Sequence, residues 1–430
     1  MNTNSPNSAP GFPGLGIAPV LLQALDRMKI SVPTPIQSQA IPQALEGKDI
    51  AGIAQTGTGK TIAFGIPMIQ RLAVVKGAGL VVLPTRELAQ QVDESIRKLG
   101  EGIGIRTAVL IGGASLGPQI QALRRNPHIV IGTPGRMNDL LMQRYLRLDE
   151  VRIVVLDEAD RMLDMGFAPQ IEKIFHALPR DRQTMLFSAT MPDGIMKLAS
   201  AYMKMPIRIE VAPTGTLDQG VTQELFVVAR EQRTRLLDKL LQQYSGATLI
   251  FTRTKHGAHK LANTIRGMGH TASEMHANRS QSQRREALDG FKKGKYRILT
   301  ATDIASRGID VTGIALVLNY DLPTNPEDYV HRIGRTARAG AGGHAISFVA
   351  PEQRGEVRGI ERLIRKTLTV SKLPELPPPR VVHNDASLHR PPNQHGYQQG
   401  HQAGRPQGGQ PGPDNRRSSS YPRAQNRFRR

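Results

Sequence analysis

The sequence predicts a protein of two α/β domains, each built on a parallel β-sheet. Three observations support this fold class. Short apolar runs alternate with amphipathic segments, polar clusters follow the apolar runs directly, and the alternation breaks once, near residues 212–220. Alternating strand-like and helix-like segments are typical of βαβ units, whose strands run parallel. At 430 residues the chain is long enough for two or three domains.

The first half of the chain contains six strand candidates. They are residues 50–54, 80–83, 107–111, 129–131, 153–156 and 184–187. A polar or glycine-bearing cluster follows each of them at once. Because open α/β sheets bind ligands beyond the carboxyl ends of their strands, we expect these clusters to form one composite site at one edge of one sheet.

The second half repeats this alternation. Its strand candidates are residues 225–228, 248–251, 297–301, 315–319 and 345–349. Polar clusters again follow strands, but this half has no second glycine-rich loop of the kind that binds phosphate. We therefore predict a second α/β domain of similar size, a duplication of architecture without a detectable repeat in the sequence.

Changes in composition predict five segments along the chain. These are a flexible arm (1–11), a first α/β domain (12–211), a linker (212–220), a second α/β domain (221–372) and a disordered basic tail (373–430). The tail has too few apolar residues to form a core. Its last arginines are interleaved with Tyr421 and Phe428, which suits loose binding to single strands; an inert solubilising tail is the alternative.

Composition also limits the functional class. The formal net charge of +21 and the pI near 10.5 favour a polyanionic partner, nucleic acid before an anionic membrane surface, with plain solubility as the alternative. The chain has no cysteine, which excludes disulfides and thiolate metal sites and fits a reducing cytosol. No apolar stretch approaches the roughly 18 residues that span a bilayer. We expect a soluble, cytoplasmic protein.

The clearest motif is Ala54-Gln55-Thr56-Gly57-Thr58-Gly59-Lys60-Thr61, which lies between a strand candidate and a helix-compatible segment. This order of elements is that of a phosphate-binding P-loop. Backbone N–H groups of such a loop and of the helix N-terminus bind phosphate oxygens. Lys60 is expected to reach the β- and γ-phosphates, and the Thr61 hydroxyl to bind Mg²⁺. A Gly/Thr turn without a ligand is the alternative.

A second motif places carboxylates at the end of an apolar strand, in Leu156-Asp157-Glu158-Ala159-Asp160. An acidic residue at a strand end near a P-loop is the expected partner of Mg²⁺, so Asp157 is the candidate metal ligand. Glu158 is placed to orient and deprotonate the attacking water. Asp160 is expected to form an ion pair across the site. A solvated acidic turn is the alternative.

Together the two motifs resemble the DEAD-box family of ATP-dependent RNA helicases, in superfamily 2. The resemblance covers about Phe12 to Val349, and the other family motifs follow in family order. They are the Q motif (33–37), motif Ia (84–89), a glycine pair (112–113), motif Ib (133–136), motif III (188–190), motif IV (249–254), motif V (300–310) and motif VI (331–338). Residues 161–167 are similar to the bacterial RhlE-type subgroup.

The resemblance implies two RecA-like domains that bind ATP between them. Gln37 is expected to contact the adenine edge and Phe12 to stack on the ring, which predicts ATP over GTP. Gly308 and Asp310 are implied near the ribose and phosphates.

The resemblance also implies residues that act when the domains close. Arg335 and Arg338 occupy arginine-finger positions and would meet the γ-phosphate on closure. His331 is implied as a bridge near Asp160 or Gln37.

The implied RNA site lies across both domains and contacts phosphates and 2′-OH groups, so binding should be independent of base sequence and sensitive to salt. Ser188 and Thr190, with Asp160, are expected to couple the acidic motif to domain closure. The RNA-binding candidates are short polar groups, backbone N–H groups and arginines: Pro84, Thr85, Arg86, Gly113, Thr133, Arg136, Arg253 and Thr302. A helix N-cap is the alternative for Thr85 and Thr133.

The expected function is RNA-stimulated ATP hydrolysis coupled to local, non-processive unwinding of short RNA duplexes or to remodelling of RNA–protein complexes. ATP and Mg²⁺ are the expected cofactors, RNA is the expected partner, and the core is expected to be monomeric. Two alternatives stay open: an ATP-gated RNA clamp or assembly scaffold, and a DNA-directed helicase of superfamily 2. The physiological RNA and its pathway are not indicated by the sequence.

Overall fold

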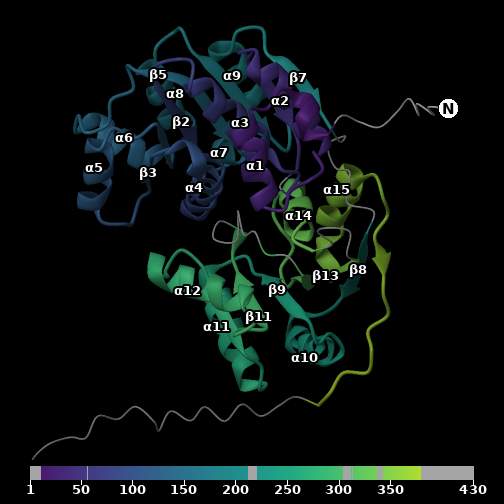
Figure 1. The fold of residues 1–430 in the computed structure, drawn as a ribbon. Coiled ribbons are helices and arrows are strands. Elements are labelled where there is room, and N and C mark those ends of the chain that lie inside the picture. The colour runs from purple at the N-terminus through teal and green to yellow at the C-terminus, as the bar shows by residue number, and fades with distance from the viewer. Residues whose placement is uncertain are drawn as a thin grey trace, which may run out of the picture. The chain divides into compact units, whose positions relative to one another are not determined.

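The computed structural model describes residues 11–55, 57–211, 220–303, 311, 313–336 and 342–378 (Figure 1). Both sheets belong to one compact unit, which spans residues 1–380. The predictions that concern Thr56, Gly308, Asp310 and Arg338 lie outside the described residues. So do the predictions for residues 1–10 of the arm, for 212–219 of the linker and for the tail from 379 onward.

The first sheet has seven parallel strands in the order β3-β4-β2-β5-β6-β1-β7. Their bounds are β1 Ile50–Ile53, β2 Ala78–Val82, β3 Thr107–Leu110, β4 Ile129–Gly132, β5 Val151–Asp157, β6 Gln183–Ser188 and β7 Ile207–Glu210. All six predicted strands are present. Strand β7 was not predicted, because this short edge strand alternates Ile-Arg-Ile-Glu and lacks an apolar run.

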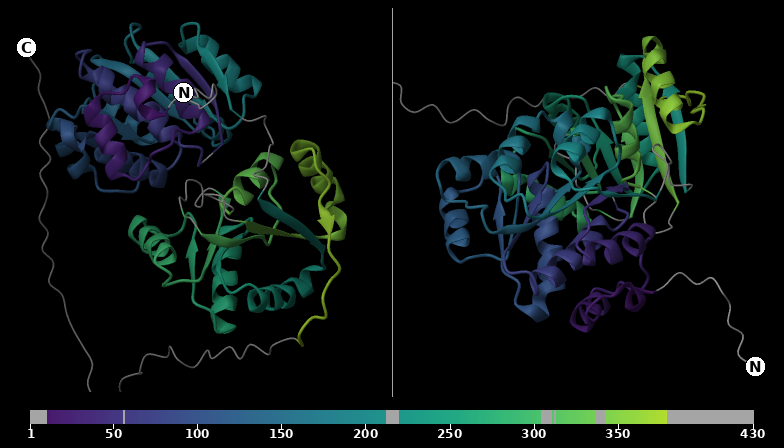
Figure 2. Two further views of the ribbon diagram at one scale, coloured as in Figure 1. Left: turned by 45° about the vertical axis from the view of Figure 1, so that its right-hand side comes forward. Right: turned by 90° about the horizontal axis from the view of Figure 1, so that it is seen from above.

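Helices cover both faces of this sheet, as the further views in Figure 2 show. They are α1 Pro19–Arg27, α2 Pro35–Leu45, α3 Lys60–Leu72, α4 Arg86–Gly100, α5 Leu116–Arg124, α6 Pro134–Met142, α7 Ala159–Asp164, α8 Ala168–His176 and α9 Asp193–Tyr202, with short 3-10 helices at Phe12–Leu15 and Glu101–Ile103. The core on one face joins α1 to α4, and the core on the other joins α6 to α9.

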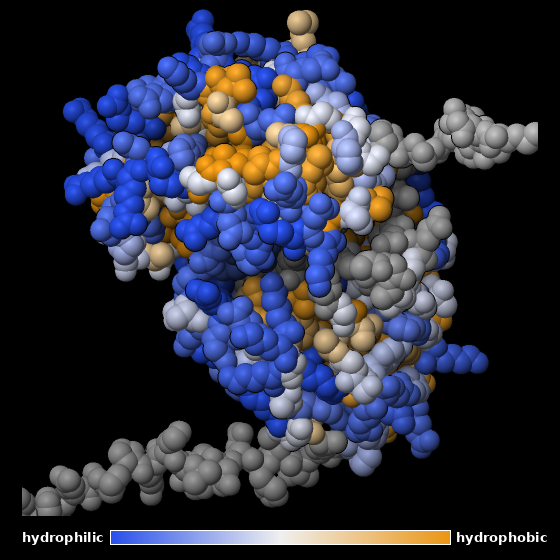
Figure 3. All heavy atoms as spheres, viewed as in Figure 1, coloured by the Kyte–Doolittle hydropathy of each residue, from blue (hydrophilic) through white to orange (hydrophobic). Residues whose placement is uncertain are grey.

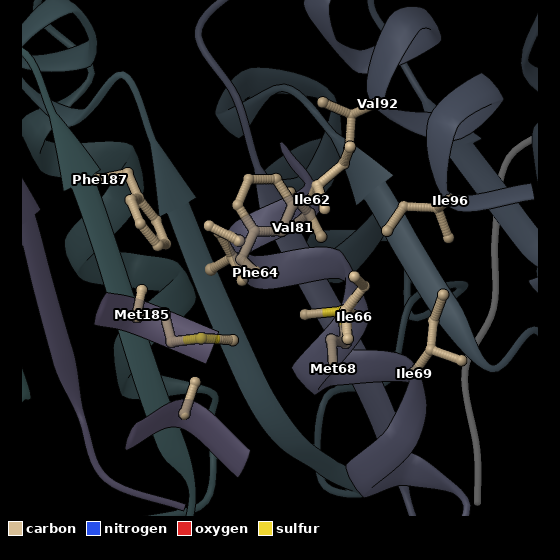
Figure 4. Packing of buried hydrophobic residues seen from close by; sticks show 14 of the residues in the cluster. Ile62, Phe64, Ile66, Met68, Ile69, Val81, Val92, Ile96, Met185 and Phe187 are labelled. Carbon is tan, nitrogen blue, oxygen red and sulfur yellow. The ribbon is translucent and has the colours of Figure 1, made fainter. Parts of the chain in front are cut away.

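Strand β5 shows how one short apolar run supplies both cores. Ile153 and Val155 lie in the α1–α4 core, and Val154 and Leu156 lie in the opposite one. Successive side chains of a strand point to opposite faces, so a strand buried on both sides is apolar throughout. Figure 4 shows part of the α1–α4 core, where aromatic rings from α3 and β6 lie 5.6 Å apart between centroids.

The second sheet has the order β10-β11-β9-β12-β13-β8-β14, again all parallel. Its strands are β8 Val221–Val227, β9 Ala247–Phe251, β10 Ala272–Met275, β11 Ile298–Ala301, β12 Ile314–Asn319, β13 Gly343–Val349 and β14 Thr369–Val370. Its helices include α10 Arg233–Gln243, α11 Lys255–Gly267, α12 Gln281–Lys292, α14 Pro326–Ile333 and α15 Arg354–Ile364, with 3-10 turns at Arg230–Gln232 and Pro351–Gln353.

Counted from the first strand of each sheet, the two strand orders are identical, so the predicted duplication of architecture is confirmed. All five predicted strands of the second half are present. Strands β10 and β14 were not predicted: β10 reads Ala-Ser-Glu-Met, which is no apolar run, and β14 has only two residues.

The predicted start of the tail at residue 373 is wrong. Leu376 packs against the core of the second domain. Arg235 donates from Nε to the carbonyl oxygen of Pro377 over 2.6 Å and from Nη2 to that of Leu376 over 3.2 Å. The segment up to residue 378 is therefore held by α10 and belongs to the second domain.

Hydrophilic residues cover most of the face drawn in Figure 3, and the apolar residues visible there lie mainly over the first domain. None of the helices in the described part of the chain is both long enough and apolar enough to cross a membrane.

Candidate nucleotide and RNA site

The P-loop connects β1 to α3 and has the backbone that its glycines allow. Gly57 and Gly59 have φ values of 91° and 89°, in the left-handed region that side chains disfavour. A Cβ atom at Gly59 would also collide with the amide of Gln37. Lys60, the first residue of α3, is buried, and its Nζ donates to the carbonyl oxygen of Ala54 over 3.1 Å. This hydrogen bond from the Lys60 side chain to Ala54 joins the end of the loop to its beginning.

The acidic motif reaches the P-loop across an intervening strand. Strand β6 lies between β5 and β1, yet Lys60 Nζ is 3.6 Å from Asp157 Oδ1, and their side chains are only 5% and 6% exposed. Burial raises the pKa of Asp157 to about 6, against the opposing effect of Lys60. A desolvated carboxylate beside the P-loop lysine fits Mg²⁺, which prefers oxygen ligands.

Glu158 follows directly and sits in an unusual backbone conformation. Its φ of 54° and ψ of 50° are left-handed, which is uncommon for a residue other than glycine and costs energy that its surroundings must supply. Arg161 Nη1 donates to Glu158 Oε2 over 2.8 Å, and both side chains are buried. Burial by itself would raise the pKa of Glu158, but Arg161 and Lys60 outweigh it and hold that pKa well below its ordinary range.

Asp160 is bound by motif III. Its Oδ2 accepts hydrogen bonds from the backbone N–H groups of Ala189 and Thr190, at 3.1 and 3.0 Å, and from the Thr190 hydroxyl at 3.1 Å. The Ser188 hydroxyl accepts from the backbone N–H of Asp160 over 3.1 Å. Among the described residues these contacts replace the expected ion pair of Asp160. They join the ends of β5 and β6 directly.

Gln37 links the Q motif to the P-loop. Its Oε1 accepts from the backbone N–H of Thr34 over 2.9 Å, and its Nε2 donates to the carbonyl oxygen of Gly59 over 3.0 Å. Thr34 adds a 2.7 Å hydrogen bond from its hydroxyl to the carbonyl oxygen of Thr58. An amide has a second lone pair and a second N–H, so Gln37 retains one acceptor and one donor site for an adenine edge.

Phe12, which is expected to stack on the adenine ring, is buried in the structure. Its side chain is 2% exposed and belongs to the core formed by α1 to α4. Stacking on an adenine needs one open face of the ring, so that role requires the ring to be uncovered first. The role of Phe12 stays a prediction with this added condition.

Motif VI lies at the end of α14. Arg332, buried and not predicted as a site residue, forms a two-pronged ion pair with Asp303 at 2.6 and 2.8 Å and also donates to Asn319. Arg335 is buried, and its Nε donates to the carbonyl oxygen of His331 over 3.2 Å. Arg332 thus ties α14 to Asp303 and Asn319. The side chain of Arg335 is held by its hydrogen bond to the last turn of α14.

His331 is held neutral. Burial, assisted by the nearby charge of Arg161, lowers the pKa of His331 from 6.5 to about 3, and Asp160 opposes this shift. A small pocket lies between Arg161, which follows the acidic motif, and motif VI; it is lined by Arg161, Phe251, Asp303, Asp328, His331, Arg332 and Arg335. Arg161 and Arg335 both lie near enough to Glu158 to lower its pKa. Their positive charges are therefore placed where they could balance the negative charge of a bound phosphate.

The predicted RNA-binding residues of the first domain follow three strand ends. Thr85 caps α4, its hydroxyl accepting from the backbone N–H of Leu88 over 3.3 Å, which is the alternative stated above. Thr133 precedes α6 without a side-chain cap bond. Arg136 donates to the carbonyl oxygen of Ala114 at 3.2 and 3.3 Å.

Pro84 precedes the cap of α4 and is buried, and Gly113 has a left-handed φ of 73°. A Cβ atom at Gly113 would collide with the guanidinium of Arg86. These neighbouring strand ends therefore bring the first-domain candidates to one edge of the sheet.

The two second-domain candidates follow β9 and β11, which are neighbours in the sheet. Arg253 is exposed, and its backbone N–H donates to Asp321 over 3.0 Å. Thr302 is partly buried, and its backbone N–H donates to the carbonyl oxygen of Met275 over 3.3 Å.

Comparison with known proteins now adds to this geometry. The DEAD/DEAH box helicase family matches residues 34–198, and the helicase conserved C-terminal domain matches residues 232–340. The chain is 43% identical over 368 residues to the DEAD-box ATP-dependent RNA helicase CshA of Geobacillus kaustophilus, a match that covers 85% of this chain and 79% of that protein.

This chain belongs to the DEAD-box family of ATP-dependent RNA helicases. It is also 42% identical over 372 residues to the ATP-dependent rRNA helicase RRP3 of Debaryomyces hansenii, covering 86% of this chain and 77% of that protein. As a member of the family it is an ATP hydrolase. The resemblance on which the sequence analysis relied is confirmed; its RhlE-type detail is not tested by these relatives.

Solved DEAD-box structures share the fold. S. cerevisiae Dbp5 bound to RNA and ADP BeF3 aligns with a TM-score of 0.77 and 31% identity, covering 84% of this chain and 95% of that one. Mss116p bound to ssRNA and AMP-PNP aligns with a TM-score of 0.78 and 26% identity, covering 86% and 82%. Both of those structures contain RNA, together with ADP BeF3 in Dbp5 and with AMP-PNP in Mss116p.

Sequence reasoning missed several residues of this DEAD-box helicase. Arg161 enters the sequence prediction only within the segment that resembles a subgroup. A positive residue three positions after Glu158 on a helix also predicts an ion pair with Glu158. Glu87 of α4 and Arg284 of α12 form a buried ion pair at 2.9 Å. No local signal predicts that pair, because its members are far apart in the chain.

Proposed function

We propose that this DEAD-box helicase binds ATP with Mg²⁺ at the P-loop of its first domain and uses hydrolysis to separate short RNA duplexes locally. The observation that supports this most directly is the buried approach of Lys60 to Asp157, at 3.6 Å. A phosphate-binding lysine and a metal-binding carboxylate are thereby placed at one edge of the sheet, where Mg²⁺-ATP would bind.

Each group of the site has one role in the proposed reaction. Lys60 and the backbone of the loop bind the phosphates, and the oxygens of Thr61 and Asp157 would hold Mg²⁺, which when bound would supply positive charge beside the phosphates. Glu158 accepts the proton of the attacking water. Arg335, with Arg338 beyond the described residues, stabilises the charge of the transition state.

Domain closure connects hydrolysis to RNA. Asp160 already joins the acidic motif to motif III through Thr190, so a change at the phosphates can reach the end of β6. RNA and ATP together would shift the population toward a closed form, in which one RNA strand is bent, and hydrolysis would reopen it. Local melting follows from closure of one cleft on a few nucleotides, without tracking along the strand.

The RNA contacts proposed here are to the backbone. Thr85, Gly113, Arg136 and Arg253 offer hydroxyl, N–H and guanidinium groups, which bind phosphates and 2′-OH groups without reading bases. We propose RNA duplexes and RNA–protein complexes as substrates and a monomer as the working unit. The cytoplasmic compartment stays a prediction from composition.

The test is ATP turnover measured without nucleic acid, with single-stranded RNA and with DNA of the same sequence. Stimulation by RNA alone supports the proposal, and equal stimulation by DNA contradicts its RNA specificity. A duplex-release assay then separates unwinding from clamping. A clamp would retain RNA in the presence of a non-hydrolysable ATP analogue while releasing no strand during hydrolysis.

A further inference from the structure

A cluster of metal-binding residue types lies in the second domain, apart from the nucleotide site. His259 comes from α11, Glu274 from the edge strand β10, and His276 follows that strand. One ligand atom from each residue lies within 4.8 Å of the others. Helix α11, labelled in Figure 1, packs on β10 and so brings residues 15 and more positions apart to one point.

The distances show a carboxylate between two imidazoles. Glu274 Oε2 is 2.9 Å from His259 Nδ1 and 3.3 Å from His276 Nε2. Ligand atoms of a tetrahedral zinc ion with bonds of about 2.0–2.2 Å lie at roughly this mutual separation. Small side-chain movements are therefore enough for all three residues to bind one ion.

The cluster is buried on one side and open to solvent on the other. The side chains of Glu274 and His276 are 2% and 5% exposed, whereas that of His259 is 53% exposed. An ion can thus enter past His259 and keep water at a fourth position, as open zinc sites do. Asn263 Nδ2 lies 3.1 Å from His259 Nε2 and donates to it, so the Asn263 amide must turn when an ion binds His259 at Nδ1.

Two further features describe the polar partners of this cluster. The buried Nδ1 of His276 has no hydrogen-bond partner in the part of the chain that the structure describes. The His276 nitrogen that faces Glu274 is Nε2, so Nδ1 is the nitrogen left to bind water when Nε2 binds the ion. The guanidinium of Arg279 contacts Glu274 and is itself partly exposed. Arg279 thus neutralises the buried carboxylate of Glu274, and the Arg279 side chain can move into solvent.

We propose that His259, Glu274 and His276 bind one divalent transition-metal ion, with Zn²⁺ as the favoured ion, and that this ion displaces the guanidinium of Arg279. Two nitrogen ligands and one carboxylate suit Zn²⁺ and its neighbours better than Mg²⁺, which prefers oxygen alone. The bound ion would tie α11 to β10 and stabilise the second domain. The site is separate from the Mg²⁺ proposed beside Asp157.

The test uses the full, untagged chain without nucleotide and measures Zn²⁺ binding by competition with a chromophoric chelator. Wild type is compared with three variants, His259→Ala, Arg279→Ala and His176→Ala. His259 and His176 are both exposed, so neither change threatens folding, and every variant keeps the same histidines in residues 379–430. Adventitious binding by those histidines is therefore common to all four.

The proposal predicts one Zn²⁺ per chain that His259→Ala weakens by at least about tenfold and that His176→Ala leaves in place. Arg279→Ala should tighten binding, because no positive group then competes for Glu274. Co²⁺ should give the visible spectrum of a four-coordinate site in wild type and lose it in His259→Ala. Zn²⁺ should also raise the melting temperature of wild type, His176→Ala and Arg279→Ala, and should do so least in His259→Ala.

Equal Zn²⁺ stoichiometry and affinity in His259→Ala and wild type would overturn the site. Unchanged or weaker binding in Arg279→Ala would equally overturn it, since the arginine would then be a permanent partner of Glu274 in a hydrogen-bonded cluster. Glu274→Gln keeps the shape of the side chain and removes its charge. Retained binding in that variant would contradict the assigned ligand.

Discussion

Arg161 donates a 2.8 Å hydrogen bond to the carboxylate of Glu158, and both residues are buried beside the P-loop. The proposed base of the reaction is thus paired with a cation. A buried carboxylate with such a partner is held deprotonated but is a weak base. Arg161 therefore lowers the pKa, and with it the basicity, of the Glu158 carboxylate.

Replacing Arg161 should change how hydrolysis depends on pH. In Arg161→Ala, the largest charge that offsets burial at Glu158 is lost while that of Lys60 remains, so the pKa of Glu158 should rise, and the acidic limb of RNA-stimulated ATP turnover should move upward by about one pH unit or more. Arg161→Lys retains the charge and should keep the limb near its wild-type position. Superimposable profiles for the alanine variant and wild type would show that the pair does not act on Glu158.

Glu158→Gln should abolish most ATP turnover while leaving ATP binding intact. The amide keeps the shape of the side chain but cannot take a proton from water, a loss worth about 10²–10⁴ in rate. Steady-state hydrolysis and the Kd of a fluorescent ATP analogue are the two measurements. Glu172→Gln, an exposed change on α8, is the control. Wild-type turnover in Glu158→Gln would remove the base from that position.

Gln37→Glu should weaken ATP binding by about tenfold or more, since each 1.4 kcal/mol is tenfold in affinity. The change places a carboxylate oxygen against the carbonyl oxygen of Gly59, which now accepts a hydrogen bond from the amide. Gln70→Glu is a matched control, because Gln70 accepts from the N–H of Ala18 and donates to the carbonyl of Gly16 in the same way. If both variants bind ATP like wild type, Gln37 does not serve the nucleotide.

Arg335→Lys should slow hydrolysis by about a thousandfold or more with little change in ATP affinity, because finger arginines act on the transition state. Lysine keeps the charge but not the planar fork that matches phosphate geometry. Single-turnover hydrolysis at saturating RNA is the measurement. Restoration of the rate by lysine would mean that charge alone is needed at this position.

His331 should make the folded protein less stable in acid. Its pKa in the folded state, about 3, lies below the ordinary 6.5, so between these values the unfolded chain binds a proton that the folded chain excludes. This contribution is present above pH 6.5 and is lost as the pH falls toward 3. His331→Asn should flatten the pH dependence of the melting temperature across this window. His176→Asn on α8 is the exposed control, and an equal slope in His331→Asn and wild type would contradict the argument.

Local patterns predicted a large part of this architecture. The apolar run that ends at Asp157 and the run that precedes Ala54 both became buried strands, because a strand covered on two faces must be apolar at every position. Strand β10 escaped prediction because Glu274 and Ser273 are buried there by packing from α11, which the run Ala-Ser-Glu-Met does not reveal.

By itself, the sequence determined the two-domain α/β class, the P-loop, the acidic motif and the family, since periodicity and motif spacing are properties of neighbours along the chain. The tertiary structure alone decided which side chains meet. It placed Lys60 against Asp157 across β6, took Phe12 into the core and brought His259 to Glu274. Strand order and helix packing join residues far apart in the chain, and burial then determines their charge state.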